Sequence, residues 1–122
     1  MKEEKNISSK DRRRSKRWNL KAPLSIFSAE SDKLVGQVID VSLHGMKIMS
    51  KHPIKKMKVM SFQIELIDVN NQPVKMPVTA FSVYCIEDEA SKGFFTGFEF
   101  VHITPECLLG LQRLIDDLAS FS

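Results

Sequence analysis

Six consecutive residues near the N-terminus could bind a strongly anionic group. They are Arg12-Arg13-Arg14-Ser15-Lys16-Arg17, in which Arg13 and Arg17 are spaced as R-x-x-x-R. A guanidinium group presents a planar fork of N–H donors that pairs bidentately with a phosphate, and its flat face can stack on a ring. The segment therefore predicts an anionic partner at this end of the chain.

A second polar motif lies further along the chain, after two apolar stretches. It is Asp40-Val41-Ser42-Leu43-His44-Gly45, of the form D-x-S-x-x-G. Asp, Ser and Gly are all common in turns, and Gly45 is predicted to have a positive φ there. In a binding site, Asp40 could accept hydrogen bonds, Ser42 could donate one, and Gly45 would let a ligand approach the backbone closely.

The remaining residues with reactive side chains form no pattern typical of catalysis or of metal binding. His44, His52 and His102 are isolated from one another, and no nucleophile with a partner base is visible. Cys85 and Cys107 lie far apart in the sequence without C-x-x-C spacing, which predicts free thiols. We therefore expect no enzyme, no metal and no cofactor.

The elements that must position the two motifs follow a period of two along most of the chain. Apolar residues alternate with polar ones over six segments, and polar turns separate them. The predicted strands are residues 20–27, 34–42, 46–50, 60–66, 74–86 and 94–101. This pattern predicts a mainly β fold, a closed or nearly closed antiparallel barrel in one domain of 122 residues.

A helix is predicted over residues 105–119, where the period changes. Leu108, Leu111, Ile115 and Leu118 recur on one face, which should lie against the barrel. Thr104 is a suitable N-cap before this segment.

The charge of the chain is unevenly distributed. Residues 1–21 carry nine Lys or Arg against three acidic residues, whereas the remainder carries nine against twelve. Residues 1–11 contain a single Ile and no aromatic residue, so we expect a disordered tail. No apolar run approaches the roughly 20 residues that span a bilayer, and no apolar signal segment opens the chain. We therefore expect no membrane insertion and a cytoplasmic protein.

In this order and context, the two motifs resemble the bipartite signature of PilZ domains, R-x-x-x-R followed by [DN]-x-S-x-x-G. Gly97-Phe98-Glu99-Phe100 near the end of the last strand, and the terminal helix, agree with that family. The resemblance covers about residues 12–118. It implies an arginine arm at 12–18, a PilZ-type barrel at 19–103 and the helix at 105–119, all within a domain of residues 12–122.

The resemblance implies a bacterial cyclic di-GMP receptor that catalyses nothing. Its ligand-binding residues would be Arg12, Arg13, Arg17, Asp40, Ser42 and Gly45. Asp40 would accept hydrogen bonds from the N1–H and N2–H groups of guanine, which adenine lacks, and the arginines would wrap over the ligand. In this family the residue before R-x-x-x-R influences stoichiometry, and Arg12 favours an intercalated pair of ligands. The flexible arm would order on binding and signal to a downstream protein.

Two alternatives remain open at this level. One is a PilZ-like adaptor that acts by protein–protein interaction without binding a nucleotide. The other is a basic β-barrel that binds single-stranded nucleic acid, which would need exposed aromatic residues on adjacent strands. The eight Phe residues alternate as core positions, which disfavours nucleic acid. The regulated process, whether motility, adhesion, exopolysaccharide synthesis or virulence, is not indicated by any motif.

Overall fold

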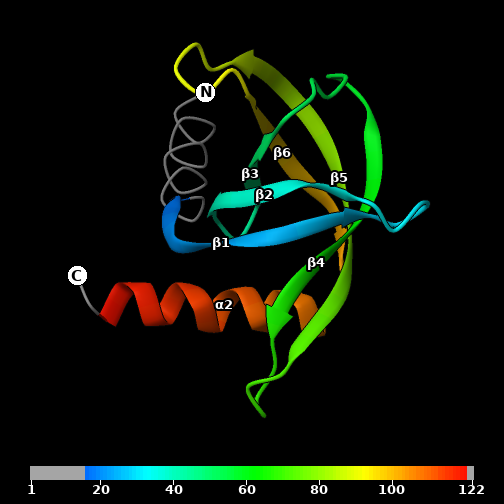
Figure 1. The fold of residues 1–122 in the computed structure, drawn as a ribbon. Coiled ribbons are helices and arrows are strands. Elements are labelled where there is room, and N and C mark those ends of the chain that lie inside the picture. Colours follow the sequence, from blue (N-terminus) through cyan, green and yellow to red (C-terminus); the bar gives the residue numbers. More distant parts are fainter. Residues whose placement is uncertain (1–15, 121–122) are drawn as a thin grey trace, which may run out of the picture.

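The computed structural model of the chain describes residues 16–120 and contains a closed antiparallel barrel of six strands (Figure 1). The strands are β1 (Trp18–Ser28), β2 (Leu34–Val41), β3 (Gly45–Ser50), β4 (Val59–Ile67), β5 (Pro73–Glu87) and β6 (Phe94–Ile103). Around the barrel their order is β1-β2-β3-β6-β5-β4. The predicted fold class is confirmed.

Alternating side chains of these strands fill the barrel with apolar groups. Ile26, Ile48 and Ile64 are fully buried, and the rings of Phe62 and Phe98 meet edge to face with their centroids 5.2 Å apart. Each inward residue is flanked by outward ones, because successive side chains of a strand point to opposite faces of the sheet. The core therefore forces the other residues of each strand onto the outer surface.

Strand β1 is the most irregular part of the barrel. Its pairing with β2 shifts register between Asn19 and Leu24, and Pro23 lies inside that shift. Since proline has no N–H to donate, a position outside the regular ladder suits it. On its other side, β1 pairs with β4 only from Ile26 to Ser28. Strand β1 begins at Trp18, a residue that the sequence had placed in the arm.

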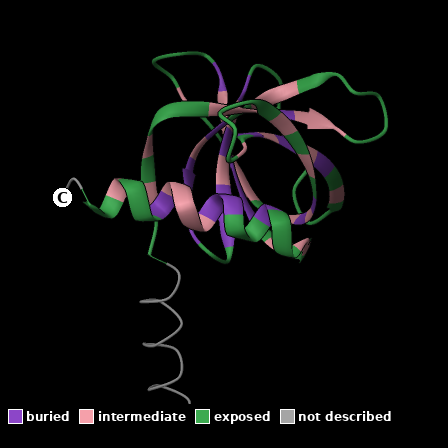
Figure 2. Cartoon of the chain, turned by 90° about the horizontal axis from the view of Figure 1, so that it is seen from below, coloured by how far each residue is buried: buried purple, intermediate pink, exposed green. Residues whose placement is uncertain are grey.

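Helix α2 (Pro105–Ser120) lies across one end of the barrel, below β1 in Figure 1. Thr104 caps it as predicted, because its Oγ1 accepts a hydrogen bond from the N–H of Cys107 at 3.2 Å. The buried face differs from the predicted stripe. Cys107, Leu111 and Ile115 are buried, whereas Leu108 is 37% exposed. Figure 2 shows that buried, intermediate and exposed residues alternate along the helix. The helix is therefore rotated towards Cys107, and the prediction for Leu108 was wrong.

The aromatic residues are less buried than the sequence suggested. Among the described phenylalanines only Phe62 and Phe98 are fully buried, and the others are partly accessible. The prediction that phenylalanines belong mostly to the core was therefore wrong, because several face outward from β1, β5 and β6. Over residues 16–120 no helix is both long and apolar enough to cross a membrane.

Candidate functional site

The structure brings the two predicted motifs together at Arg17 and Asp40. Arg17 immediately precedes β1, and Asp40 lies near the end of β2, where the register places it opposite Asn19. The Nη1 atom of Arg17 donates to Oδ1 of Asp40 at 2.9 Å. On the other side, Nζ of Lys47 lies 3.6 Å from Oδ2 of Asp40. One buried carboxylate thus holds two cationic side chains on the outer surface of the barrel.

These residues belong to a row that crosses four neighbouring strand pairs. The row consists of Asn19 in β1, Asp40 in β2, Lys47 in β3, Gly97 in β6 and Tyr84 in β5. Residues in register across a sheet share a face. Because Lys47 lies between two fully buried core residues, Met46 and Ile48, this row faces outward. The site is therefore a surface on the barrel wall.

Tyr84 and Gly97 form the aromatic part of this surface. A Cβ atom placed on Gly97 would lie 2.2 Å from Cε2 of Tyr84, so the tyrosine ring occupies the space that a side chain at position 97 would need. On the neighbouring outward row, Nζ of Lys47 lies 5.9 Å from the ring centroid of Phe95. The surface thus combines a carboxylate, two cations and partly exposed rings, a set that suits a ligand with both phosphates and bases.

Ser42 and Gly45 both stabilise the turn between β2 and β3. The Oγ atom of Ser42 accepts hydrogen bonds from the N–H groups of His44 and Gly45, both at 3.1 Å, and Ser42 is buried. Within residues 16–120 no glycine has a positive φ, so that prediction for Gly45 was wrong. Gly45 is needed because a Cβ there would lie 2.2 Å from the carbonyl oxygen of Phe98. The close approach seen in the structure is to strand β6.

Two predicted site residues lie outside the described part of the chain, and three residues of the site were not predicted from the sequence. Arg12 and Arg13 fall within 1–15, which the structure does not describe. Sequence reasoning missed Lys47, Tyr84 and Gly97 as members of the site. Their outward positions follow the period of two, but only the register between β3, β6 and β5 shows that they meet beside Asp40.

The fold and the site define a six-stranded antiparallel barrel, capped by a helix, with a carboxylate and cations on its outer wall. The chain belongs to the PilZ domain family, whose model matches residues 11–117. No curated protein matches the sequence significantly.

Three solved structures share the fold over 89% of this chain. The inhibitor of motility of Bacillus subtilis (MotI/DgrA) has a TM-score of 0.72, 16% identity and 52% of its chain covered. YcgR of Escherichia coli in complex with c-di-GMP has a TM-score of 0.63, 21% identity and 46% covered. The PilZ domain of YcgR with c-di-GMP has a TM-score of 0.58, 18% identity and 92% covered. The chain thus spans about half the length of the first two proteins.

Proposed function

We propose that this chain is a cyclic di-GMP receptor that binds the dinucleotide through its R-x-x-x-R and D-x-S-x-x-G motifs. Membership of the PilZ family supports the proposal, as does the similarity in fold to two structures that contain c-di-GMP. The observation that carries it is the contact of 2.9 Å between Arg17 and Asp40, because it joins the two motifs at one surface.

The chemistry of the surface suits a guanine dinucleotide. Each oxygen of the Asp40 carboxylate can accept more than one hydrogen bond, so the carboxylate that holds Arg17 and Lys47 has acceptor sites for guanine N1–H and N2–H once Arg17 has moved aside. The guanidinium of Arg17 can pair with a phosphate or with O6 and N7 of guanine. The ring of Tyr84 provides a face on which a base could stack. Arg12 and Arg13 would complete the grip from the arm.

Binding would have to reorganise the pair between Arg17 and Asp40. When a phosphate competes for the guanidinium, Arg17 can move from the carboxylate to the ligand, and Asp40 becomes available to the base. Trp18 follows directly in β1, where it packs against the core, and Nζ of Lys16 lies 4.3 Å from the centroid of its ring. A change at Arg17 is therefore transmitted to Trp18 through one peptide unit. This is the basis for a signal to a partner protein through the arm.

Titration calorimetry with cyclic di-GMP tests the proposal, with cyclic di-AMP, GTP and a single-stranded oligonucleotide as controls. We expect binding of cyclic di-GMP alone, with two ligands per chain at saturation because Arg12 can neutralise and stack on a second molecule. Equal affinity for cyclic di-AMP would contradict the role of Asp40. A ratio of one ligand per chain would contradict the intercalated pair of ligands. Binding of the oligonucleotide instead would favour the nucleic-acid alternative, which the accessible rings of Tyr84 and Phe95 make worth testing.

A matched pair of variants separates a specific site from a diffuse basic surface. Arg17→Ala should weaken binding by about 1.5–3 kcal/mol, because it removes charge-assisted hydrogen bonds. Lys16→Ala is the control, since its ammonium group lies over Trp18, and it should cost under about 1 kcal/mol. Equal losses would indicate a diffuse patch. If the wild-type chain binds no nucleotide, the alternative of an adaptor that acts by protein–protein interaction is favoured.

Amide hydrogen exchange across residues 8–20 tests the signalling step. We expect exchange to slow when cyclic di-GMP saturates the site, because ligand and arm order together. Unchanged exchange in the presence of confirmed binding would exclude the arm as the switch.

A further inference from the structure

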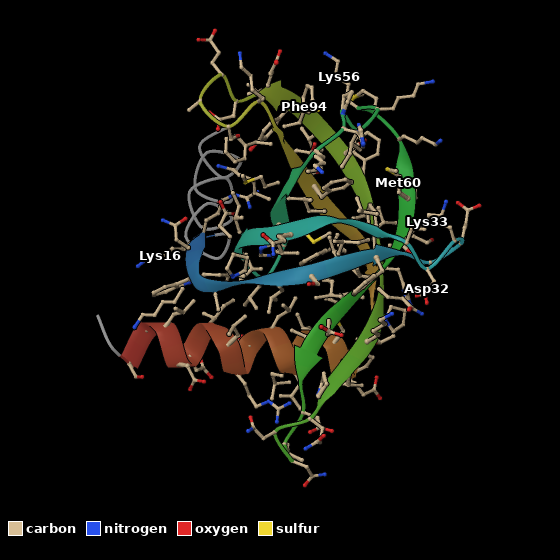
Figure 3. All side chains as sticks on the ribbon, viewed as in Figure 1. Lys16, Asp32, Lys33, Lys56, Met60 and Phe94 are labelled. Atoms are coloured by element: carbon tan, nitrogen blue, oxygen red, sulfur yellow. The ribbon has the colours of Figure 1, made fainter. Side chains whose placement is uncertain are left out.

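The connection between β3 and β4 contains a basic cluster that takes no part in the proposed nucleotide site. Lys55-Lys56-Met57-Lys58, here called the lysine loop, lies at the end of the barrel opposite α2 (Figure 3, where Lys56 is labelled). All four of its side chains are exposed. A charged loop is often only solvated. The geometry of its backbone and of its neighbours indicates whether it also binds a partner.

The lysine loop is held rigidly by one buried residue, Ser82 of β5. The Oγ of Ser82 donates to the carbonyl oxygen of Lys55 at 2.7 Å, and its backbone N–H donates to the carbonyl oxygen of Lys58 at 2.9 Å. In return, the N–H groups of Met57 and Lys58 donate to the carbonyl oxygen and Oγ of Ser82. A loop fixed by four such bonds presents one shape to its surroundings.

Within this rigid loop, Met57 adopts an unfavourable backbone conformation and exposes its side chain. Its φ is 63°, in the left-handed region that long side chains rarely adopt, and it is 69% exposed. Burial does not explain a methionine there, and glycine would fit the backbone better. Strained positions that the surrounding structure maintains are concentrated at functional sites.

Met57 lies beside other outward apolar residues of the barrel. Val59, 53% exposed, follows the lysine loop and pairs with Phe81 of β5 on the outer face. Val83, two residues further along β5, is 39% exposed. The apolar centre formed by Met57, Val59, Phe81 and Val83 is thus bordered by Lys55, Lys56 and Lys58. An apolar centre with a charged rim is the usual anatomy of a protein interface, and methionine adapts well to such surfaces.

We propose that this surface docks an acidic protein partner, with an apolar contact on Met57 and Val59 and carboxylates facing the lysines. The inference rests on the proposed function, because it gives the receptor a surface for its downstream protein. Val83 directly precedes Tyr84, so a partner docked here would lie beside the nucleotide surface. Complementary charge would also accelerate association.

A protein is favoured over an anionic membrane by the neighbouring charges. Ser50, Phe94 and Glu87 are in register, so Glu87 at the end of β5, and Asp88 and Glu89 in the turn after it, lie at the same end of the barrel as the lysine loop (Figure 1). These carboxylates would be repelled by a broad anionic bilayer. A partner of limited size can contact the lysines without facing the acidic turn.

Photocrosslinking in the native host identifies the partner. A benzophenone amino acid replaces Met57 in one strain and Val69, which is 80% exposed in the β4–β5 turn, in the control strain. We expect a defined protein adduct with an acidic surface from position 57 and none from position 69. No adduct at 57, or the same adduct from both positions, would overturn the proposal.

Affinity measurements with the purified adduct partner then test the chemistry. Lys56→Glu with Lys58→Glu should weaken its binding at least 30-fold. Lys33→Glu with Arg113→Glu, an equal change of charge away from the lysine loop, should weaken it less than threefold. Met57→Gly should weaken it at least tenfold while the fold is retained, because glycine accepts a φ of 63°. Unaffected binding in these variants would refute the docking surface.

Two further measurements distinguish the remaining outcomes. Sedimentation with vesicles of phosphatidylcholine and phosphatidylglycerol, mixed at about two to one, should show no binding that depends on the lysines. Such binding would replace the protein partner with a membrane. Cyclic di-GMP affinity should change less than threefold in the Lys56→Glu/Lys58→Glu variant. Failure to dock with normal nucleotide binding would refute this inference alone, whereas absence of nucleotide binding by the wild-type chain would refute the proposed function.

Discussion

Replacement of Asp40 by Asn should weaken both the fold and the nucleotide site. The substitution keeps the shape of the side chain but removes its charge. An Asn carbonyl oxygen could still accept from Arg17, but its NH2 group would then face the ammonium of Lys47. The variant therefore loses one favourable contact and weakens the other.

The size of the effect on stability follows from the burial of the three groups. The side chain of Asp40 is 6% exposed, but those of Arg17 and Lys47 are 42% and 32% exposed. Because both cations reach water, neither is left as a buried unpaired charge, and the loss of about 3–5 kcal/mol typical of broken buried pairs does not apply. We expect the free energy of unfolding to fall by about 1–1.5 kcal/mol, slightly more than for an exposed pair.

The chain contains a matched control for this substitution. Lys75 and Asp32 form an ion pair with an N–O distance of 3.1 Å, close to that of the Arg17–Asp40 pair, but Asp32 is 70% exposed. Asp32→Asn should therefore cost under about 0.5 kcal/mol and leave nucleotide binding unchanged. The two variants differ mainly in the burial of the carboxylate.

Urea denaturation followed by the fluorescence of the single tryptophan, Trp18, measures the stability of both variants. Calorimetry measures their affinity for cyclic di-GMP, which Asp40→Asn should lower by about 10- to 100-fold, since about 1.4 kcal/mol corresponds to a factor of ten. If Asp40→Asn proves no more destabilising than Asp32→Asn, the burial argument is wrong. If its affinity is unchanged, Asp40 does not contact the guanine.

Three other substitutions and one chemical modification test the geometry of the barrel. Gly45→Ala should lower the free energy of unfolding in urea by about 2–3 kcal/mol, because its Cβ meets the β6 backbone. Gly97→Ala meets only the movable ring of Tyr84, so it should cost under about 1.5 kcal/mol while weakening nucleotide binding. Equal costs would contradict this distinction. The buried Oγ1 of Thr96 has no hydrogen-bond partner among residues 16–120, so Thr96→Val should raise the free energy of unfolding by about 1 kcal/mol, and a loss of stability would indicate a missed partner. Burial raises the pKa of Cys107 to about 11, so little of its thiolate exists at pH 8. Mass spectrometry should therefore show that iodoacetamide modifies the half-buried Cys85 first in the native protein. Equal rates of modification would show that Cys107 is accessible.

Local patterns in the sequence were sufficient to predict most of the elements. The alternation of Met60, Phe62 and Ile64 predicted β4, because a strand with one buried face must have a period of two. The N-cap at Thr104 was also predictable, since it depends only on residues within one turn. The two motifs predicted the family for the same reason, because they are contiguous stretches of sequence.

The errors occurred where a residue's role depends on a distant strand. Gly45 was predicted from turn chemistry to have a positive φ, whereas the carbonyl oxygen of Phe98, in the last strand of the barrel, is what excludes a side chain there. The buried face of α2 includes Cys107 instead of Leu108, because the direction in which the helix crosses the barrel selects the face. No local pattern contains either piece of information.

The order of residues along the chain was enough to establish an arginine motif and a D-x-S-x-x-G motif among six period-two segments followed by a helix. It took the folded barrel to bring Arg17 to Asp40 and to add Lys47 and Tyr84 beside them. Side-chain composition sets which face of each strand is buried, whereas register and barrel closure set which outward residues become neighbours. A shift of one residue between two strands would leave both strands intact and separate the members of the site.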